Sequence, residues 1–410
     1  MGDDRWSAGH APHQAVPVGR RIEFRRTQRR LSRRAVANLV GRSEEWLRLI
    51  ESGRLRLDSI EATIRLAEVL QIADFRELID RPVPPERPTP AAAELVSALR
   101  PAILDHPGLA DAMAATDMPA TDWPAELLRC EQLWSRSRDR FTQTARFLPR
   151  VLVAARGWHW RTGGGDTTEL LIGAYHLCRQ VLSAMGAHDL ALLVADRAVA
   201  ATSGQDRPAV LAASAWHMSE ALLPLHPAAC RDFALATAQF VGQELIDEIA
   251  LRGALQLVAA KAAATAADSM AADHLLTAAA RTAHRLEGAH VACGVAFGPD
   301  EIALTRMEIA LAAGDFDSVI AVATGLDGAE SEPAGRRARY HILVATALAG
   351  RGDDVGAVYA LVRAAEASPE DVRYDADAVR TLKQLLRDDN RMLRRELERL
   401  TELADLGGAR

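Results

Sequence analysis

Arginine is concentrated in one short stretch of the chain, and its guanidinium group is suited to binding phosphate. Residues 18–57 hold four acids, Glu23, Glu44, Glu45 and Glu51, and twelve arginines: Arg20, Arg21, Arg25, Arg26, Arg29, Arg30, Arg33, Arg34, Arg42, Arg48, Arg54 and Arg56. Their charge is 12 − 4 = +8 in a chain of net charge −6, so the remainder carries −14. This local basic patch indicates nucleic-acid binding. A solvated helix face is the alternative, but it leaves unexplained why the excess stops near Leu57.

Residues typical of catalytic or metal sites do not gather into a pattern. The histidines are scattered, with His159, His176 and His217 far apart in the sequence. The four cysteines contain no Cys-x-x-Cys pair and are expected to be small buried residues in a reducing cytosol: Cys130, Cys178, Cys230 and Cys293. We therefore expect no enzyme activity, no metal site and no cofactor.

The arginines need a scaffold, and the stretch Arg33–Gly53 predicts one. It reads RRAVANLVGRSEEWLRLIESG, with two short runs of helical periodicity separated by Gly41. Small Ala37 suits a close helix crossing, Gly41 suits a turn with positive φ, and Leu47 and Ile50 suit the inner side of the second helix. These constraints are those of a DNA-binding helix-turn-helix.

The flanking sequence extends this motif to a domain. Gly19–Arg30 is expected to be a preceding helix, Ser59–Leu70 a fourth helix and Asp74–Ile79 a short fifth. The register LSRRAVANLVGRSEEWLRLIESG…LDSIEATIRLAEVLQI resembles the lambda-repressor-like, xenobiotic-response-element (XRE) family of bacterial regulators over about residues 18–79. The resemblance implies a five-helix DNA-binding domain at residues 18–80. The alternative is a helical domain used only for dimerisation.

The resemblance also implies the residues that read DNA bases. The recognition helix would be Ser43–Ser52, and its outward side carries Ser43, Glu44, Glu45 and Arg48. Arg48 suits a bidentate contact with guanine, and a glutamate can accept from the cytosine amino group. Alternatively, the two acids suppress nonspecific binding, or one merely favours the helix N-terminus.

Further arginines are candidates for phosphate contacts. Family members commonly carry Gln where this chain has Arg33, which moves the expected role of Arg33 toward phosphate. The remaining phosphate candidates are Arg34, Arg42, Arg54 and Arg56.

The chain outside this domain divides by composition. Residues 1–17 are expected to be a disordered arm, and residues 81–90, RPVPPERPTP, a proline-rich linker with five prolines. Residues 91–166 are a helical connection, with helices predicted at Ala91–Leu104, Ala125–Phe147 and, restarting after Pro149, Leu148–Arg156. Residues 373–410 are expected to form a C-terminal helix that caps the preceding repeats or pairs with a second subunit.

Residues 167–372 repeat a unit of two helices and a turn. Gly186, Gly314 and Gly352 mark three turns, and weaker units turn near His226 and Ala267. The unit YHILVATALAGRGDDVGAVYALVRAAEASP follows the tetratricopeptide pattern closely, although the spacings exceed the usual length of roughly 34 residues. We predict a tetratricopeptide-like solenoid. A generic Ala-rich bundle is the alternative.

The first helix of each tetratricopeptide unit would line a concave wall. The ligand-facing steps in the five units fall on His176 and Gln180, Trp216 and Glu220, Leu257 and Lys261, Leu304 and Glu308, and Ile342 and Thr346. Unit stacking predicts that Glu220, Lys261 and Glu308 form a row of acid, base and acid. The row would orient a polar ligand or simply hold the wall together through ion pairs. An ordinary solvated groove is the other interpretation.

Composition favours an all-α fold, because Ala and Leu dominate and no β-branched run alternates with period two. No apolar run reaches 18 residues and the N-terminus lacks an apolar core, so we expect a cytoplasmic protein without membrane contact. The favoured function is a homodimeric, sequence-specific regulator of transcription that binds double-stranded DNA. Its repeats would sense a peptide or small-molecule effector or mediate dimerisation. In the rival interpretation the repeats are a protein-docking scaffold that the first domain localises to DNA.

Overall fold

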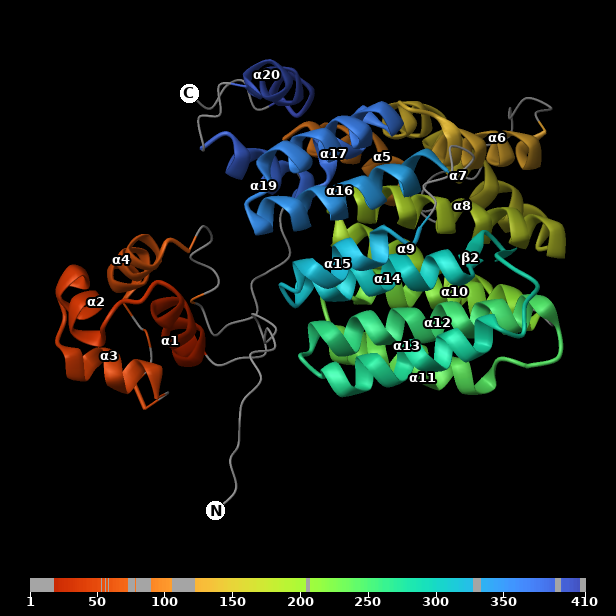
Figure 1. Ribbon diagram of the computed structural model, residues 1–410. Coiled ribbons are helices and arrows are strands. Elements are labelled where there is room, and N and C mark those ends of the chain that lie inside the picture. Colours follow the sequence, from red (N-terminus) through yellow and green to blue (C-terminus); the bar gives the residue numbers. More distant parts are fainter. Residues whose placement is uncertain are drawn as a thin grey trace.

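The computed structural model describes most of the chain and confirms an all-α fold (Figure 1). It describes residues 18–52, 54–55, 57, 59–72, 78, 90–104, 122–203, 207–326, 333–387 and 392–405. The described residues form twenty helices and one two-stranded sheet. The expected arm at residues 1–17, fifth helix at Asp74–Ile79 and linker at residues 81–90 lie outside the described residues, except for Leu78 and Pro90.

Four helices form the N-terminal domain around one small core. They are α1 (Val18–Gln28), α2 (Arg33–Val40), α3 (Glu44–Glu51) and α4 (Ile60–Leu70). The helices bury Ile22, Val36, Leu47 and Leu66 at the centre of the domain. Burial of these side chains, one from each helix, supplies a large part of the apolar contribution to folding of this domain.

Helices α5 (Pro90–Leu104), α6 (Trp123–Arg136) and α7 (Arg140–Thr162) begin the second part of the chain. The predicted helix at Ala125–Phe147 is wrong, because the break falls between Arg136 and Arg140, and α7 continues through Pro149. An internal proline costs a helix about 3 kcal/mol. Complete burial of Leu148 and Leu152 on either side of Pro149 offsets this cost.

Five antiparallel helix pairs follow, and their turns fall where the sequence predicts them. Gly186, Gly314 and Gly352 adopt φ values of 73°, 73° and 80°, which glycine tolerates. Ala267 also has positive φ, and His226 precedes the helix at the remaining turn. The pairs are α8 (Gly165–Ala184) with α9 (His188–Ala201), α10 (Pro208–Leu222) with α11 (Pro227–Phe240), α12 (Ile246–Thr265) with α13 (Ser269–Ala283), α14 (Pro299–Ala312) with α15 (Phe316–Ala323), and α16 (Ala334–Arg351) with α17 (Asp354–Ala367).

The first helices of these pairs form a closed circuit of contacts with α6. Helix α8 contacts α10, α10 contacts α12, α12 contacts α14, and α14 contacts α16. Helix α16 then contacts α6, which in turn contacts α8. The end of the array therefore returns to its beginning, through the contact of α16 with α6. An open solenoid would leave these two ends apart, whereas here they are in contact.

A β-hairpin, absent from the sequence-based prediction, joins the third and fourth pairs. Strand β1 (His290–Ala292) pairs antiparallel with β2 (Val295–Phe297). Positive φ at both Cys293 and Gly294 is typical of a two-residue hairpin turn. Cys293 is exposed at this turn, whereas the other three cysteines are buried, so the prediction of burial is wrong for Cys293 alone.

The described part of residues 373–410 contains two separate helices, α19 (Ala376–Leu385) and α20 (Arg394–Leu403), rather than the single one predicted. A short helix, α18 (Pro369–Tyr374), precedes them. Asp375 interrupts the run, because its carboxylate caps α19 by accepting from the backbone N–H groups of Asp377 and Ala378. Leu397 and Leu400 of α20 are buried in a cluster with residues of α17 and α19. Within this chain, α20 therefore packs as a cap.

Candidate nucleic-acid interface and inner helix wall

Helices α2 and α3 form the predicted pair with a tight turn. Ser32 and Ser43 cap them, since their hydroxyls accept from the backbone N–H groups of Ala35 and Trp46 at 3.1 Å each. Gly41 ends α2 in the left-handed region with φ of 73°. Local sequence signals thus fix where both helices begin and where the first one ends.

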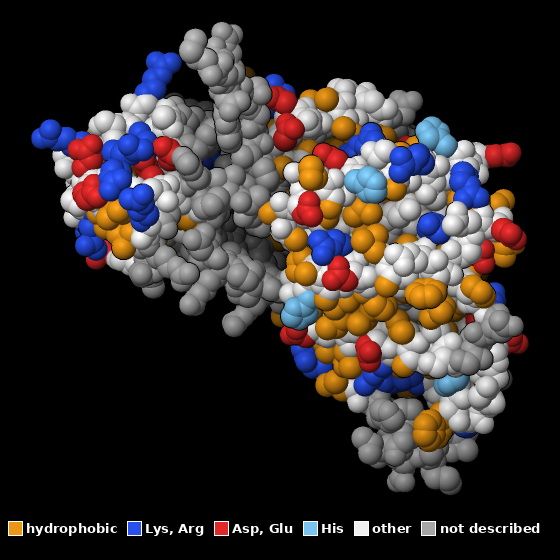
Figure 2. Space-filling model, turned by 90° about the horizontal axis from the view of Figure 1, so that it is seen from below, with side chains coloured by type: hydrophobic (Ala, Val, Ile, Leu, Met, Phe, Trp, Pro, Cys, Tyr) orange, Lys and Arg blue, Asp and Glu red, His pale blue; other side chains and the backbone are white. Residues whose placement is uncertain are grey.

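Helix α3 presents a polar face to solvent. Leu47 and Ile50 are buried against the domain core, whereas Glu44, Glu45 and Arg48 are exposed. Figure 2 shows acidic and basic side chains interspersed on this domain, which lies on the left of that view. The outward side predicted for the recognition helix is therefore solvent-accessible in the described structure.

Arg48 and Glu45 form a bidentate ion pair on this face. The Nε and Nη2 atoms of Arg48 donate to Glu45 Oε2 and Oε1 at 2.7 and 2.6 Å. The hydrogen bond from Arg48 lowers the pKa of Glu45, and the same bond raises the pKa of Arg48. Both groups are charged at neutral pH. Ser43 differs from these two because its hydroxyl is used in capping α3.

Glu51, near the end of α3, has a structural role that the sequence did not reveal. Its carboxylate is buried and accepts from Arg26 Nε at 2.6 Å and from Arg33 Nε at 2.5 Å. Arg33 also pairs with Glu23 at 3.2 Å, and the bond to Glu51 raises the pKa of Arg33. Arg33 therefore links α1, α2 and α3, which competes with the phosphate role expected for it. The signal available in the sequence was an acidic residue within a strongly basic stretch, where a partner among the arginines is to be expected.

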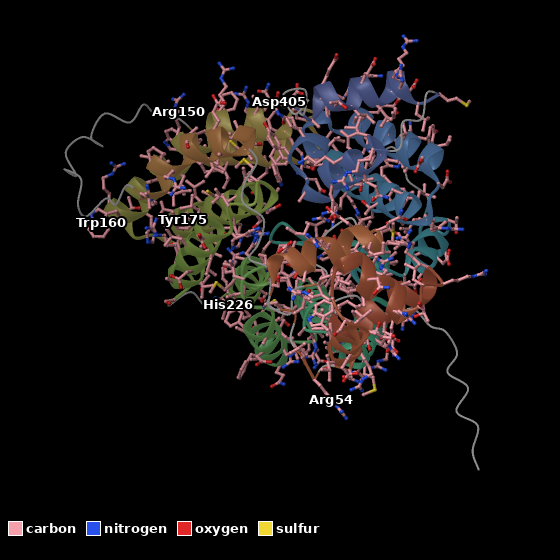
Figure 3. All side chains as sticks on the ribbon, turned by 90° about the vertical axis from the view of Figure 1, so that its left-hand side faces the viewer. Arg54, Arg150, Trp160, Tyr175, His226 and Asp405 are labelled. Carbon is pink, nitrogen blue, oxygen red and sulfur yellow. The ribbon has the colours of Figure 1, made fainter. Side chains whose placement is uncertain are left out.

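The other phosphate candidates have different surroundings. Arg34, Arg42 and Arg54 are exposed, and Figure 3 shows Arg54 extending away from its ribbon. The guanidinium carbon of Arg42 lies 5.9 Å from the centroid of the Trp46 ring, within cation–π range. Arg56 lies outside the described residues.

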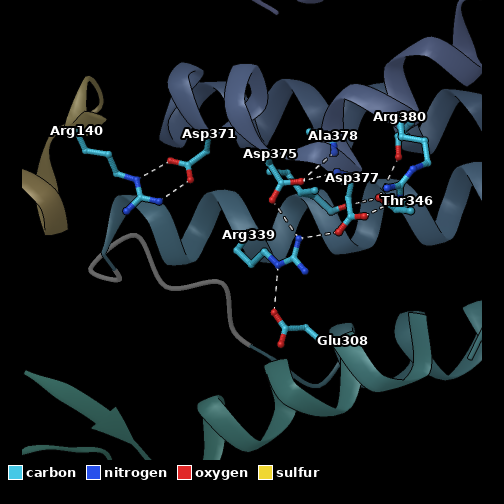
Figure 4. A network of polar contacts seen from close by, with 11 residues as sticks. Arg140, Glu308, Arg339, Thr346, Asp371, Asp375, Asp377, Ala378 and Arg380 are labelled. Carbon is cyan, nitrogen blue, oxygen red and sulfur yellow. Dashed lines mark hydrogen bonds and ion pairs between the residues drawn. The ribbon is translucent and has the colours of Figure 1, made fainter. Parts of the chain in front are cut away.

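A ladder of alternating charge crosses the first helices of the repeats. Lys261 Nζ lies 2.6 Å from Glu220 Oε1 and 3.9 Å from Glu308 Oε2, which confirms the predicted row of acid, base and acid. The ladder continues from Glu308 to Arg339 at 3.1 Å. Arg339 then reaches Asp375 at 3.1 Å and Asp377 at 2.9 Å (Figure 4). We call the set Glu220, Lys261, Glu308, Arg339, Asp375 and Asp377 the charge ladder.

Burial and pairing act in opposite directions within the charge ladder. Burial lowers the pKa of Lys261, but Glu220 and Glu308 outweigh it, and the pKa is raised. Burial dominates at Asp375, where it raises the pKa to about 6 against the attraction of Arg339. Burial is also the largest influence at Asp377, but Arg339 and Arg380 together keep its pKa lowered. Each ladder charge already has a partner within the chain, which favours the wall-stabilising alternative for this row.

Other predicted wall residues contact neighbouring helices. His176 is buried, with Nε2 2.9 Å from Ser214 Oγ, and its ring stacks on His217 with centroids 3.9 Å apart. Gln180 accepts from Trp134 Nε1 at 3.2 Å. The placement of His176 therefore contradicts the groove-facing position predicted for it.

Trp216 remains half-buried and lies edge-on to His217 at 4.9 Å. Among the other predicted wall positions, Leu257 and Ile342 are buried in the apolar core, and Thr346 bonds to Thr381 at 3.0 Å. Leu304 is half-buried within an apolar cluster. Trp216 is thus the aromatic member of the wall that keeps partial exposure.

Buried histidines and Arg179 form a second polar cluster that sequence reasoning did not identify. Arg179 Nε lies 3.0 Å from His217 Nδ1 and donates to it. Burial lowers the pKa of His176 to about 3, and burial together with the His176 and Arg179 charges places the pKa of His217 well below its ordinary value. Both imidazoles are therefore neutral at physiological pH.

The comparison with known families agrees with the geometry of the N-terminal domain. Residues 17–80 match a family model described as a helix-turn-helix domain, which supports the resemblance to XRE-type DNA-binding domains. The match ends at residue 80 and leaves the helical array outside it. No curated protein and no solved structure matches the chain. Among the residues that the structure describes, no helix is both long and apolar enough to cross a bilayer.

Proposed function

We propose that the protein is a sequence-specific regulator of transcription that binds double-stranded DNA through α3. The observation that carries the proposal is the exposed Glu44, Glu45 and Arg48 face of a helix that follows a helix-turn-helix bend. The match of residues 17–80 to a helix-turn-helix domain supports the same reading. In this motif the second helix enters the major groove, where side chains near its N-terminus meet the base edges.

The proposed roles of the arginines follow from how exposed each side chain is. Arg48 contacts guanine, whose O6 and N7 accept two hydrogen bonds from an arginine. Arg34, Arg42 and Arg54, all exposed, bind phosphates. Arg33 stabilises the domain through Glu51 and contributes to phosphate binding only through its remaining donors.

We also propose that the protein acts as a cytoplasmic homodimer on an inverted repeat. One domain of this size reads few base pairs, and two-fold dimers double the contacted sequence. Light scattering at micromolar concentration is expected to give twice the chain mass of 44.3 kDa. A protein that stays monomeric both alone and on DNA contradicts this assembly.

The helical array, in this proposal, is a non-catalytic module of the tetratricopeptide-like type that receives a signal. Half-buried Trp216 offers apolar contact for a peptide or small molecule. Reporter expression in the host, measured across growth, is expected to lose its response in Trp216→Ala while DNA affinity stays unchanged. Wild-type regulation in this variant contradicts the effector site.

A second candidate function is a protein-docking scaffold held on DNA by the first domain. The closed circuit of helices favours it, because a rigid array offers a fixed outer surface to another protein. Co-purification of one stoichiometric protein from the native host would support the scaffold. A small molecule or peptide that raises the melting temperature would support the sensor.

Selection of binding sites from random duplexes, followed by anisotropy titration, tests the DNA proposal. The full chain is expected to enrich one motif, and Arg48→Ala is expected to lose about 1–3 kcal/mol of discrimination at one base pair in each half-site. The same motif and affinity in Arg48→Ala would show that Arg48 is not the reading residue. No enrichment by the wild-type chain would contradict sequence-specific binding itself.

A further inference from the structure

The ion pair between Glu45 and Arg48 uses one particular edge of the guanidinium group. Arginine has five N–H donors in a planar fork, which offers two edges for bidentate bonding. Glu45 occupies the edge formed by Nε and Nη2, with both bonds shorter than 2.8 Å. The second edge, formed by Nη1 and the other hydrogen of Nη2, points away from the carboxylate. Within the described part of the chain, the Arg48 guanidinium makes hydrogen bonds and an ion pair with Glu45 and with no other side chain.

The second edge suits guanine. The O6 and N7 atoms of guanine lie side by side in the major groove and accept two parallel hydrogen bonds. An arginine held along one edge keeps the other in a fixed plane, so less rotamer freedom is lost when the base contact forms. Glu45 precedes Arg48 by three positions, which places the two side chains on the same exposed side of α3.

We propose that Glu45 is a positioning residue for DNA reading, which clamps Arg48 so that its Nη1–Nη2 edge meets O6 and N7 of one guanine. This inference rests on the proposed DNA-binding function. It assigns the guanine contact to Arg48 alone and gives Glu45 no base of its own, since both carboxylate oxygens are bonded to Arg48. The lowered pKa of Glu45 supports the arrangement, because the clamp requires an ionised carboxylate.

Glu44 provides a matched control within the same helical turn. It carries the same charge, is exposed like Glu45, and is not bonded to Arg48 in the structure. Removing either acid reduces repulsion from the phosphates to a similar degree. Only removal of Glu45 releases the clamp, so the two substitutions separate positioning from general electrostatics.

The experiment measures full-length wild type, Glu45→Ala, Glu44→Ala, Arg48→Ala and Glu45→Ala/Arg48→Ala on the selected duplex and on duplexes with the guanine replaced. The wild type is expected to prefer guanine by about 10- to 100-fold. Glu45→Ala is expected to lose most of this preference while its affinity for unrelated DNA rises. Glu44→Ala is expected to show the same rise and the full preference. In the Arg48→Ala background, loss of Glu45 should cause no further change in preference.

Three results would overturn the inference. One is an unchanged guanine preference in Glu45→Ala, which would make the pair an ordinary surface ion pair. Another is equal loss of preference in Glu44→Ala. The third is a preference for a neighbouring cytosine that is present in Arg48→Ala and absent in Glu45→Ala/Arg48→Ala. That result would mean that Glu45 itself contacts a base. A wild-type chain without sequence preference would instead refute the DNA-binding proposal, so the two failures are distinguishable.

Discussion

Arg140 and Asp371, which lie 231 positions apart in the sequence, form a bidentate ion pair with bonds of 2.7 and 2.6 Å (Figure 4). Both side chains are about one-tenth exposed. The neighbouring Glu370 accepts from the backbone N–H groups of Phe141 and Thr142, where Asp139 supplies no side-chain cap. Residues that follow the last repeat thus cap the beginning of α7, and this contact reinforces the closure that α16 and α6 provide.

Loss of the Arg140 partner is expected to destabilise the array strongly. Asp371→Asn leaves a buried guanidinium without its counter-charge, which typically costs about 3–5 kcal/mol. Asp405→Asn is the control, because its pair with Arg373 also joins a carboxylate to an arginine but is exposed, and about 0–1 kcal/mol is expected. Urea unfolding of both variants measures the difference. Equal stability of the two variants would show that the buried pair does not hold the circuit closed.

The two lysines of the chain are expected to differ sharply in their effect on stability. Lys261→Met removes the cation between Glu220 and Glu308 and should cost about 2–3 kcal/mol, because two largely buried carboxylates then face each other. Lys383→Met changes an exposed residue and should stay within about 0.5 kcal/mol of wild type. Thermal unfolding compares them. Adding Glu220→Gln to Lys261→Met should restore part of the loss, and no recovery would argue against coupling along the charge ladder.

Stability is expected to fall on acidification because of His176 and His217. Their pKa values in the folded chain lie below the ordinary value of about 6.5, at about 3 for His176, so the unfolded chain binds protons first. As the pH falls below about 6.5, each histidine should therefore lower stability by up to about 1.4 kcal/mol per pH unit, and for His176 this continues down to about pH 3. Asp375 acts in the opposite direction between about pH 4 and pH 6, since its folded pKa is raised to about 6.

The test compares the pH dependence of unfolding rather than its absolute value. His217→Gln should reduce the slope between pH 5 and pH 6 by about 1.4 kcal/mol per unit, whatever its stability at pH 7. His226→Asn, which changes an exposed histidine, is the control and should keep the wild-type slope. A His217→Gln slope equal to wild type would show that His217 takes up protons in the folded state.

Two adjacent arginines at the start of α2 are expected to act differently. Arg33→Ala removes a partner of buried Glu51 and should destabilise the N-terminal domain by about 1–2 kcal/mol. Arg34→Ala should leave stability unchanged and reduce the slope of log affinity against log salt by about 1. Thermal unfolding and salt titration of DNA binding separate the two. Unchanged stability in Arg33→Ala would return Arg33 to the phosphate role expected from sequence.

Much of the local structure could be predicted because its causes are local. The caps at Ser32 and Ser43, the turn at Gly41 and the glycine turns of the repeats depend on neighbouring residues alone. The row from Glu220 to Glu308 was also predictable, because stacked units place equivalent positions side by side. The hairpin at residues 290–297 was missed, because strands of three residues are too short to show a clear alternation of apolar and polar side chains.

The amino-acid sequence by itself determined the all-α class, the helix-turn-helix and the positions of the repeat turns, because periodicity, capping and glycine conformation act within a few residues. The tertiary structure alone decided three contacts. Arg33 pairs with buried Glu51, His176 stacks on His217, and Arg140 pairs with Asp371. These contacts join residues 18, 41 and 231 positions apart. Local periodicity does not encode such pairs, since they depend on how the packed helices bring distant charges and rings together.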